Sequence, residues 1–334
     1  MKRSIVILHP GALGDVLLAV PAIRRLGARF PHHERLLIAR ASVSRLLSEC
    51  RIVDEWMALE RQECAGLLSG PALISGKLRS WLKRCDLAVA WTDDHDGTLA
   101  CVLPQCGARK ACIQSPFSSV LSTVHQSDRF LETVGEAAGH APSGDTVQIP
   151  RSCSEQGKAY LESRGITPDQ PLVLVHPGSG SIHKCLEPRR VALLIQQLSR
   201  GGMYPLILEG PADQDAVDHA LQFMSEPVPV LRDLDISQLA GLLAQVRLYI
   251  GHDSGVTHLS VLLGVPTIAL FGPTDPNRWA PRGSHVTILR GSHCICESPE
   301  IVKNCVEKRC LQVSLEEILI ASRHAIEKKQ CKPS

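Results

Sequence analysis

An apolar run leads into the tripeptide His-Pro-Gly twice in this sequence, at His9 and again at His176. The runs IVIL before His9 and LVLV before His176 are continuously apolar, which is typical of strands buried on both faces of a parallel sheet. Proline and glycine end each strand. Since a helical pattern follows both times, the repeat predicts two similar α/β domains, each beginning with a strand-to-helix crossing.

The rest of the chain alternates strand and helix patterns, as doubly wound parallel sheets do. Its 334 residues suffice for two domains. A stretch rich in proline, serine and glycine at 141–152 predicts the linker. We therefore expect Rossmann-like domains at 1–150 and 151–334, with a C-terminal helix that packs back on the first.

Composition excludes several classes of function. Aromatic residues make up 4% of the chain and the net charge is +2, which disfavours nucleic acid as a partner. The apolar segment at the N-terminus is too short for a signal peptide, and the run 256–271 too short to span a bilayer. These patterns predict a cytoplasmic protein. The basic, amphipathic segment 77–84 leaves open either contact with the inner membrane or a solvated helix.

Four of the 13 cysteines lie close together near the C-terminus. They are Cys294, Cys296, Cys305 and Cys310, in the spacing C-x-C-x8-C-x4-C. This spacing matches none of the standard zinc patterns, so we predict no metal site there. The other cysteines lie singly among apolar residues, as buried thiols do in a reducing compartment.

The segment GHDSGVTHL (251–259) directly follows a predicted strand. Asp253 or Ser254 suits the cap of the next helix, and Gly255 lets a ligand approach the backbone. The helix N-terminus would then bind an anion, with His258 one turn further on the same face. The alternative is an ordinary capped helix with a half-buried histidine.

The segment HPGSGSIHK (176–184) combines small residues with a cation. Ser179 and Gly180 permit a tight backbone turn, and Lys184 offers a positive charge to a phosphate. The Walker pattern and the dinucleotide pattern GxGxxG are both absent, so a loop with a solvent-facing lysine is the alternative. Two strand-to-helix connections that could each bind an anion lie in one sheet, which favours a diphosphate ligand.

The segment LEGPADQDA (208–216) places carboxylates after the next strand. Glu209 and Asp213 are candidates for contact with ribose hydroxyls, as acids are in nucleotide-binding folds. Alternatively, Asp213 only favours the start of a helix.

In the first domain, the loop with Gly11 and Gly14 precedes Asp15 at the start of a helix. Asp15 either caps this helix or acts as a general base for a hydroxyl nucleophile. The residues alone do not separate these roles.

Together these segments resemble a known family. GALGDVLLAVPAIRRL, HPGSGSIHK, EGPADQD and GHDSGVTHLSVLLGVPTIALFGPTDP are similar to motifs of the bacterial heptosyltransferases, glycosyltransferase family 9, which build the lipopolysaccharide core from ADP-heptose. The resemblance covers most of residues 1–290. It implies a GT-B fold: two Rossmann-like domains facing across a cleft, the first for the acceptor and the second for the nucleotide sugar.

The resemblance also implies roles for single residues. Asp15 matches the catalytic base and Lys184 the phosphate-binding lysine, while the segment 253–258 matches the donor-diphosphate motif. The implied reaction is inverting and needs neither metal nor cofactor. Its donor would be a nucleotide sugar such as ADP-heptose, and its acceptor a glycolipid or oligosaccharide.

Three other functions stay open. A sugar-nucleotide epimerase of similar shape would use the same diphosphate site without an acceptor. A noncatalytic nucleotide-sugar-binding protein would use Asp15 only as a cap. A nicotinamide dehydrogenase is disfavoured because GxGxxG is absent.

Overall fold

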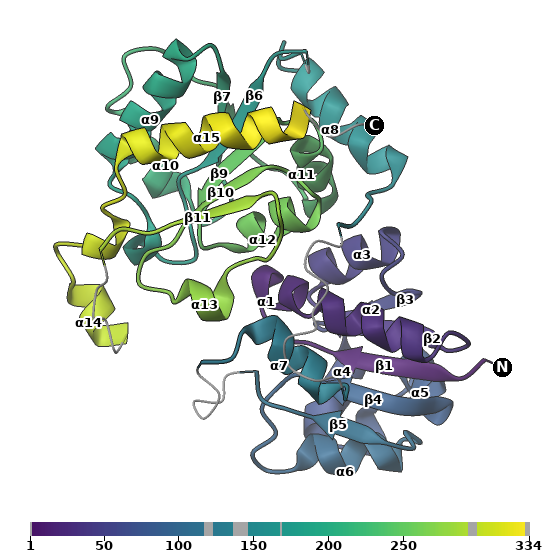
Figure 1. Cartoon of the computed structure of the whole chain (residues 1–334). Coiled ribbons are helices and arrows are strands. Elements are labelled where there is room, and N and C mark those ends of the chain that lie inside the picture. The colour runs from purple at the N-terminus through teal and green to yellow at the C-terminus, as the bar shows by residue number, and fades with distance from the viewer. Residues whose placement is uncertain (1, 117–122, 136–145, 168, 293–298, 331–334) are drawn as a thin grey trace. The chain divides into compact units, whose positions relative to one another are not determined.

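The first sheet is built around β1 (Ser4–Leu8), whose five residues are all buried. In the computed structural model β1 pairs in parallel with β2 (Glu34–Ala39) on one side and β4 (Cys85–Ala90) on the other (Figure 1). The edge strands are β3 (Glu55–Ala58) and β5 (Ala111–Ile113), giving the order β3-β2-β1-β4-β5. The chain changes direction across the sheet between β1 and β4, so their carboxyl ends border the crevice typical of this fold.

The structure describes residues 2–116, 123–135, 146–167, 169–292 and 299–330. The helices described in the first unit are α1 (Leu13–Leu18), α2 (Val20–Arg29), α3 (Ala41–Glu49), α4 (Gln62–Ser69), α5 (Gly76–Lys83), α6 (Thr98–Gln105) and α7 (Gln126–Thr133). The helix expected from Asp15 onward is two helices divided at Ala19. Pro21 lies in the first turn of α2, where a missing backbone N–H costs no hydrogen bond.

Helix α5 contains the basic, amphipathic segment that left membrane contact open. Its apolar residues Leu78, Trp81 and Leu82 are at most 5% exposed and belong to the core of the first unit. This apolar face is therefore not available to a membrane, and peripheral contact of the protein with the inner membrane stays a prediction. Among the residues described, no helix is long and apolar enough to cross a bilayer.

The second sheet repeats the arrangement around β6 (Leu172–His176), again entirely buried. Its strands are all parallel, in the order β11-β10-β9-β6-β7-β8. The remaining strands are β7 (Tyr204–Leu208), β8 (Val230–Leu231), β9 (Leu248–His252), β10 (Thr267–Leu270) and β11 (Val286–Leu289). Counted within this unit the order is 3-2-1-4-5-6, that of a dinucleotide-binding sheet, with its crevice between β6 and β9.

The second unit has helices on both faces of this sheet (Figure 1). The helices described in this unit are α8 (Arg151–Glu162), α9 (Pro188–Arg200), α10 (Gln214–Leu221), α11 (Ile236–Leu243), α12 (Gly255–Leu262), α13 (Pro276–Trp279), α14 (Pro299–Asn304) and α15 (Leu315–Gln330). The C-terminal helix α15 packs on α9 and on strands β9 to β11 of its own unit. Its Ile318 is fully buried in that core.

The chain divides into units Met1–Pro142 and Ser143–Ser334, eight residues before the boundary expected from the sequence. The N–H of Val147 donates to the carbonyl of Leu262 at 2.8 Å. Thr146 packs against Gly264, because a Cβ added to Gly264 would lie 2.9 Å from the methyl group of Thr146. The end of the expected linker is thus held by the second unit.

Close helix packing in the second unit gives a test of the fold. A Cβ added to Gly157 of α8 would lie 2.1 Å from the backbone of Gly241 in α11. We expect Gly157→Ala to lower the free energy of unfolding by about 1–3 kcal/mol, because the two backbones must separate. Urea unfolding measures this, with Gln156→Ala on the exposed side of α8 as control. Equal stability of both variants would contradict the packing.

Candidate functional site

The predicted donor residues meet at the carboxyl edge of the second sheet. The loop 177–186 leaves β6, and residues 253–255 leave the neighbouring strand β9. Glu209 follows β7, on the other side of β6. The site therefore lies at the point where this fold binds ligands.

Lys184 and Asp253 form an ion pair at this edge. Lys184 Nζ lies 2.7 Å from Asp253 Oδ2, and the lysine side chain is 32% exposed. His258 Nε2 lies 4.0 Å from the other carboxylate oxygen. Lys184 is thus held by a carboxylate yet open to solvent, which allows its ammonium group to contact an anionic ligand as well.

The N-terminus of α12 lies beside this pair. Ser254 is the N-cap, and its Oγ accepts the N–H of Thr257 at 3.4 Å. Ser179 Oγ donates to the carbonyl of Asp253 at 2.7 Å, so the loop is fastened to the start of the helix. Free N–H groups at a helix start favour anions, and Gly255 adds no side chain to block their approach.

The shape of the loop depends on its small residues. A Cβ added to Gly178 would lie 1.8 Å from an Asp213 carboxylate oxygen, so only glycine fits there. Gly180 is exposed and has open space around its Cα. The loop ends where the N–H of Leu186 donates to His252 Nε2 at 2.9 Å. Burial, with a contribution from nearby His176, lowers the pKa of His252 to about 4, so this ring is a neutral acceptor.

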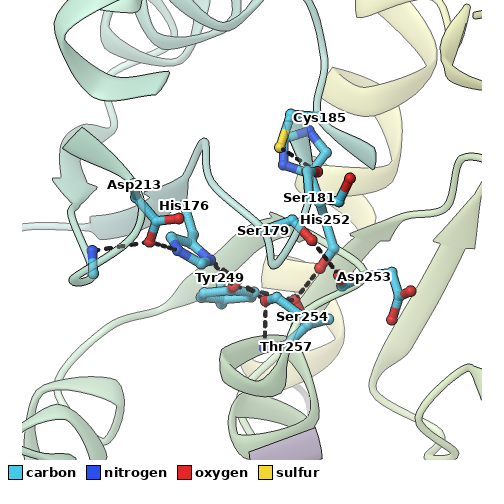
Figure 2. A network of polar contacts seen from close by, with 11 residues as sticks. His176, Ser179, Ser181, Cys185, Asp213, Tyr249, His252, Asp253, Ser254 and Thr257 are labelled. Atoms are coloured by element: carbon cyan, nitrogen blue, oxygen red, sulfur yellow. Dashed lines mark hydrogen bonds and ion pairs between the residues drawn. The ribbon is translucent and has the colours of Figure 1, made fainter. Parts of the chain in front are cut away.

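Asp213 has a partner inside the protein. His176 Nε2 lies 2.8 Å from Asp213 Oδ2, which also accepts the N–H of Gly210 at 3.0 Å. Both side chains are buried, and Figure 2 shows His176 between Asp213 and Tyr249. Burial alone would raise the pKa of Asp213, but the hydrogen bond and charge of His176 outweigh it and hold that pKa below its usual value. Ribose contact by Asp213 stays a prediction, and this geometry gives the residue a supporting role.

Glu209 is paired with a residue that the sequence gave no reason to select. Arg232 Nε donates to Glu209 Oε2 at 2.8 Å, from the loop after the neighbouring strand β8. The hydrogen bond and charge of Glu209 raise the pKa of Arg232. The hydroxyl of Tyr160 holds the backbone of Arg232, at 2.7 Å from its carbonyl and 3.0 Å from its N–H.

In the first unit Asp15 lies at the third position of α1 and is half-buried. Its Oδ2 accepts the N–H of Ala12 at 3.0 Å, which is the capping contact considered above. A Cβ on Gly11 would lie 2.9 Å from Asp15 Cβ and 2.7 Å from the His9 ring, so glycine is required between them. Gly14, in the first turn of the same helix, is also half-buried. Asp15 is thus a first-turn acid that bonds back to the N-cap residue Ala12, whereas the role of base stays a prediction.

An aromatic cluster behind Asp15 was not expected from the sequence. His9, Trp91 and Phe130 have ring centroids 5.0–5.8 Å apart, at the ends of β1 and β4 and on α7. His9 Nδ1 accepts the N–H of Gly11 at 3.2 Å. Burial lowers the pKa of His9 to about 4, so the ring is neutral. The two histidines of the repeated tripeptide thus occupy equivalent places with different partners.

The cysteine cluster is described only in part. Cys294 and Cys296 lie outside the described residues, while Cys305 is half-buried and Cys310 is buried. Within the described part of the chain, no three His, Cys, Asp or Glu side chains are grouped so that they could hold a metal ion.

Comparison with known proteins assigns the family. The profile of glycosyltransferase family 9 (heptosyltransferase) matches residues 142–311, half of the chain. The chain belongs to glycosyltransferase family 9. It is 26% identical over 140 residues to lipopolysaccharide heptosyltransferase 3 of Escherichia coli. That match covers 41% of each protein, so the chain spans about two fifths of this curated relative.

Solved structures of the same family share the fold. A family 9 glycosyl transferase from Veillonella parvula has a TM-score of 0.79 at 21% identity, over 98% of each chain. The E. coli heptosyltransferase WaaC with ADP-2-deoxy-2-fluoro heptose has a TM-score of 0.62 at 15% identity, over 98% of this chain and 99% of that one. The predicted fold class, GT-B with two Rossmann-like parallel sheets, is confirmed.

The buried pair of His176 and Asp213 predicts a dependence of stability on pH. Because the pKa of Asp213 is lowered by folding, its ionised form stabilises the fold above its ordinary pKa, and this contribution is lost as pH falls through the lower, folded pKa. We expect Asp213→Asn to lower the free energy of unfolding by roughly 1–2 kcal/mol at pH 7. The deficit should shrink in acid.

Urea unfolding at several pH values measures this effect. The control is Asp218→Asn, at an exposed position of the same helix. A deficit of Asp213→Asn that stays constant down to pH 3 would rule out the ionic contribution.

Proposed function

We propose that this protein is an inverting, metal-independent glycosyltransferase. It transfers a sugar, with ADP-heptose as the first candidate donor, to a hydroxyl of a lipopolysaccharide-core or related glycan. The observation that carries the proposal is the ion pair of Lys184 and Asp253 beside the N-terminus of α12. Support for the donor and acceptor comes from the name of the E. coli relative and from the nucleotide sugar in the WaaC structure.

The donor end of the reaction needs positive charge at the leaving group. As the bond to the sugar breaks, negative charge grows on the nucleoside diphosphate. Lys184 and the N–H groups that open α12 would stabilise this charge, and because they are fixed in place they need little reorganisation. They would supply the positive charge that a divalent cation supplies in other transferases.

The acceptor end needs a base. Asp15 would take the proton from the acceptor hydroxyl while its oxygen attacks the anomeric carbon, through a transition state with oxocarbenium character. Attack on the face opposite the leaving group inverts the configuration. The base belongs to one unit and the donor loop to the other, so both units would have to act in a single turnover.

Lys184→Ala tests the donor site. We expect the affinity for ADP, measured by calorimetry without metal, to fall about 10- to 100-fold, since a charge-assisted hydrogen bond is lost and Asp253 is left facing the phosphates. Lys158→Ala, an exposed lysine on α8, is the matched control. If both variants bind ADP as the wild type does, the assignment of the donor site is wrong.

Asp15→Asn tests the base. The amide keeps an oxygen that can accept the N–H of Ala12, so the start of α1 should persist. We expect turnover to fall about 10²- to 10⁴-fold, because the amide cannot accept the proton. Affinity for the donor should be unchanged. Undiminished turnover would show that Asp15 serves only as a cap, and product formed from the nucleotide sugar alone would favour an epimerase.

A further inference from the structure

The hydroxyl of Tyr249 lies beneath the candidate donor site, and the side chain is 0% exposed. It is 3.2 Å from His176 Nδ1 and 3.1 Å from Thr257 Oγ1 (Figure 2). A Cβ on Gly251 would lie 2.3 Å from this hydroxyl, so glycine at that position leaves room for it. Because Tyr249 is fully enclosed, any effect on a ligand must pass through its neighbours.

Ser254 shares both of these partners. Its Oγ lies 3.4 Å from His176 Nδ1 and 3.2 Å from Thr257 Oγ1. Ser254 is only half-buried and caps α12, so its hydroxyl can also turn toward a ligand at the helix start. The hydroxyl of Tyr249 is fully enclosed, so it cannot turn toward a ligand.

The protons in this network can be assigned. Asp213 is a carboxylate and can only accept, so His176 Nε2 carries a proton. While the ring carries this single proton, its Nδ1 is an acceptor for one hydroxyl. The Thr257 hydroxyl donates to the carbonyl of His252, which leaves its oxygen to accept. Burial raises the pKa of Tyr249, so that hydroxyl keeps its proton.

We propose that Tyr249 is a positioning residue for the donor diphosphate. Its hydroxyl occupies Nδ1 of His176 and so leaves the hydroxyl of Ser254 to donate to a phosphate oxygen of the bound nucleotide. The inference rests on the proposed function, which supplies the phosphate.

Tyr249→Phe is the test because it removes one oxygen. In this variant Nδ1 of His176 has only the hydroxyl of Ser254 to accept from, and Ser254 turns inward. We expect the affinity for ADP, measured by calorimetry, to fall about three- to tenfold, the range for one neutral hydrogen bond. Affinity for adenosine, titrated at millimolar concentration, should not change, because adenosine has no phosphate.

A second background separates this effect from loss of packing. With Ser254→Ala already present, Tyr249→Phe should cost no further ADP affinity, since no serine hydroxyl remains to be redirected. The matched control is Tyr204→Phe, at the amino end of β7 and thus at the opposite edge of the sheet. It should bind ADP and adenosine as the wild type does.

Three outcomes would overturn the inference. Wild-type affinity for ADP in Tyr249→Phe would show that the hydroxyl has no influence on the phosphates. An equal loss for ADP and adenosine, with additive losses in the Ser254→Ala background, would show a packing effect alone. A wild-type protein that binds no ADP would refute the proposed donor itself. The affinity of the wild type for ADP is therefore measured before any variant is compared.

Discussion

The candidate donor site of the second unit depends on the contacts that hold the loop after β6 against the end of β9. Three polar contacts do this: Ser179 to the backbone of Asp253, Leu186 to His252, and Lys184 to the carboxylate of Asp253. The first two are fixed by buried or half-buried partners. The third is partly open to solvent, so it contributes little to stability but restricts where the ammonium group can go. The shape of the loop and the position of the positive charge offered to a ligand are therefore set by different contacts.

The repeated His-Pro-Gly shows how one local sequence serves two purposes. In both sheets it ends the strand next to the crevice. His9 lies among aromatic rings, where burial lowers its pKa to about 4 and keeps it uncharged. His176 lies against the Asp213 carboxylate and two hydroxyls. The strand-to-helix geometry is a property of the fold, whereas the chemistry comes from residues far away in the sequence.

Strands β1 and β6, each of which borders a crevice, could be predicted because they are continuously apolar and are followed by proline and glycine. The division of the first helix at Ala19 could also have been read from Pro21. Other features could not. The pairing of Glu209 with Arg232 depends on β7 and β8 lying side by side. The pairing of Asp213 depends on His176, which lies at the end of β6, 37 residues earlier in the chain. Such contacts between distant segments leave no periodic signal in the sequence.

The two acids predicted to meet ribose differ in how readily they could do so. Each has a partner, but the partner of Asp213 is His176, which is itself buried, so exchanging it for a ligand would leave polar groups without hydrogen bonds. The partner of Glu209 is Arg232, whose side chain is 46% exposed. A pair open to water on one side is worth about 0–1 kcal/mol, and the guanidinium can be rehydrated as it moves away. Hydroxyl groups of a ligand could therefore displace Arg232 from Glu209 at small cost, which makes Glu209 the acid better suited to contact a nucleoside.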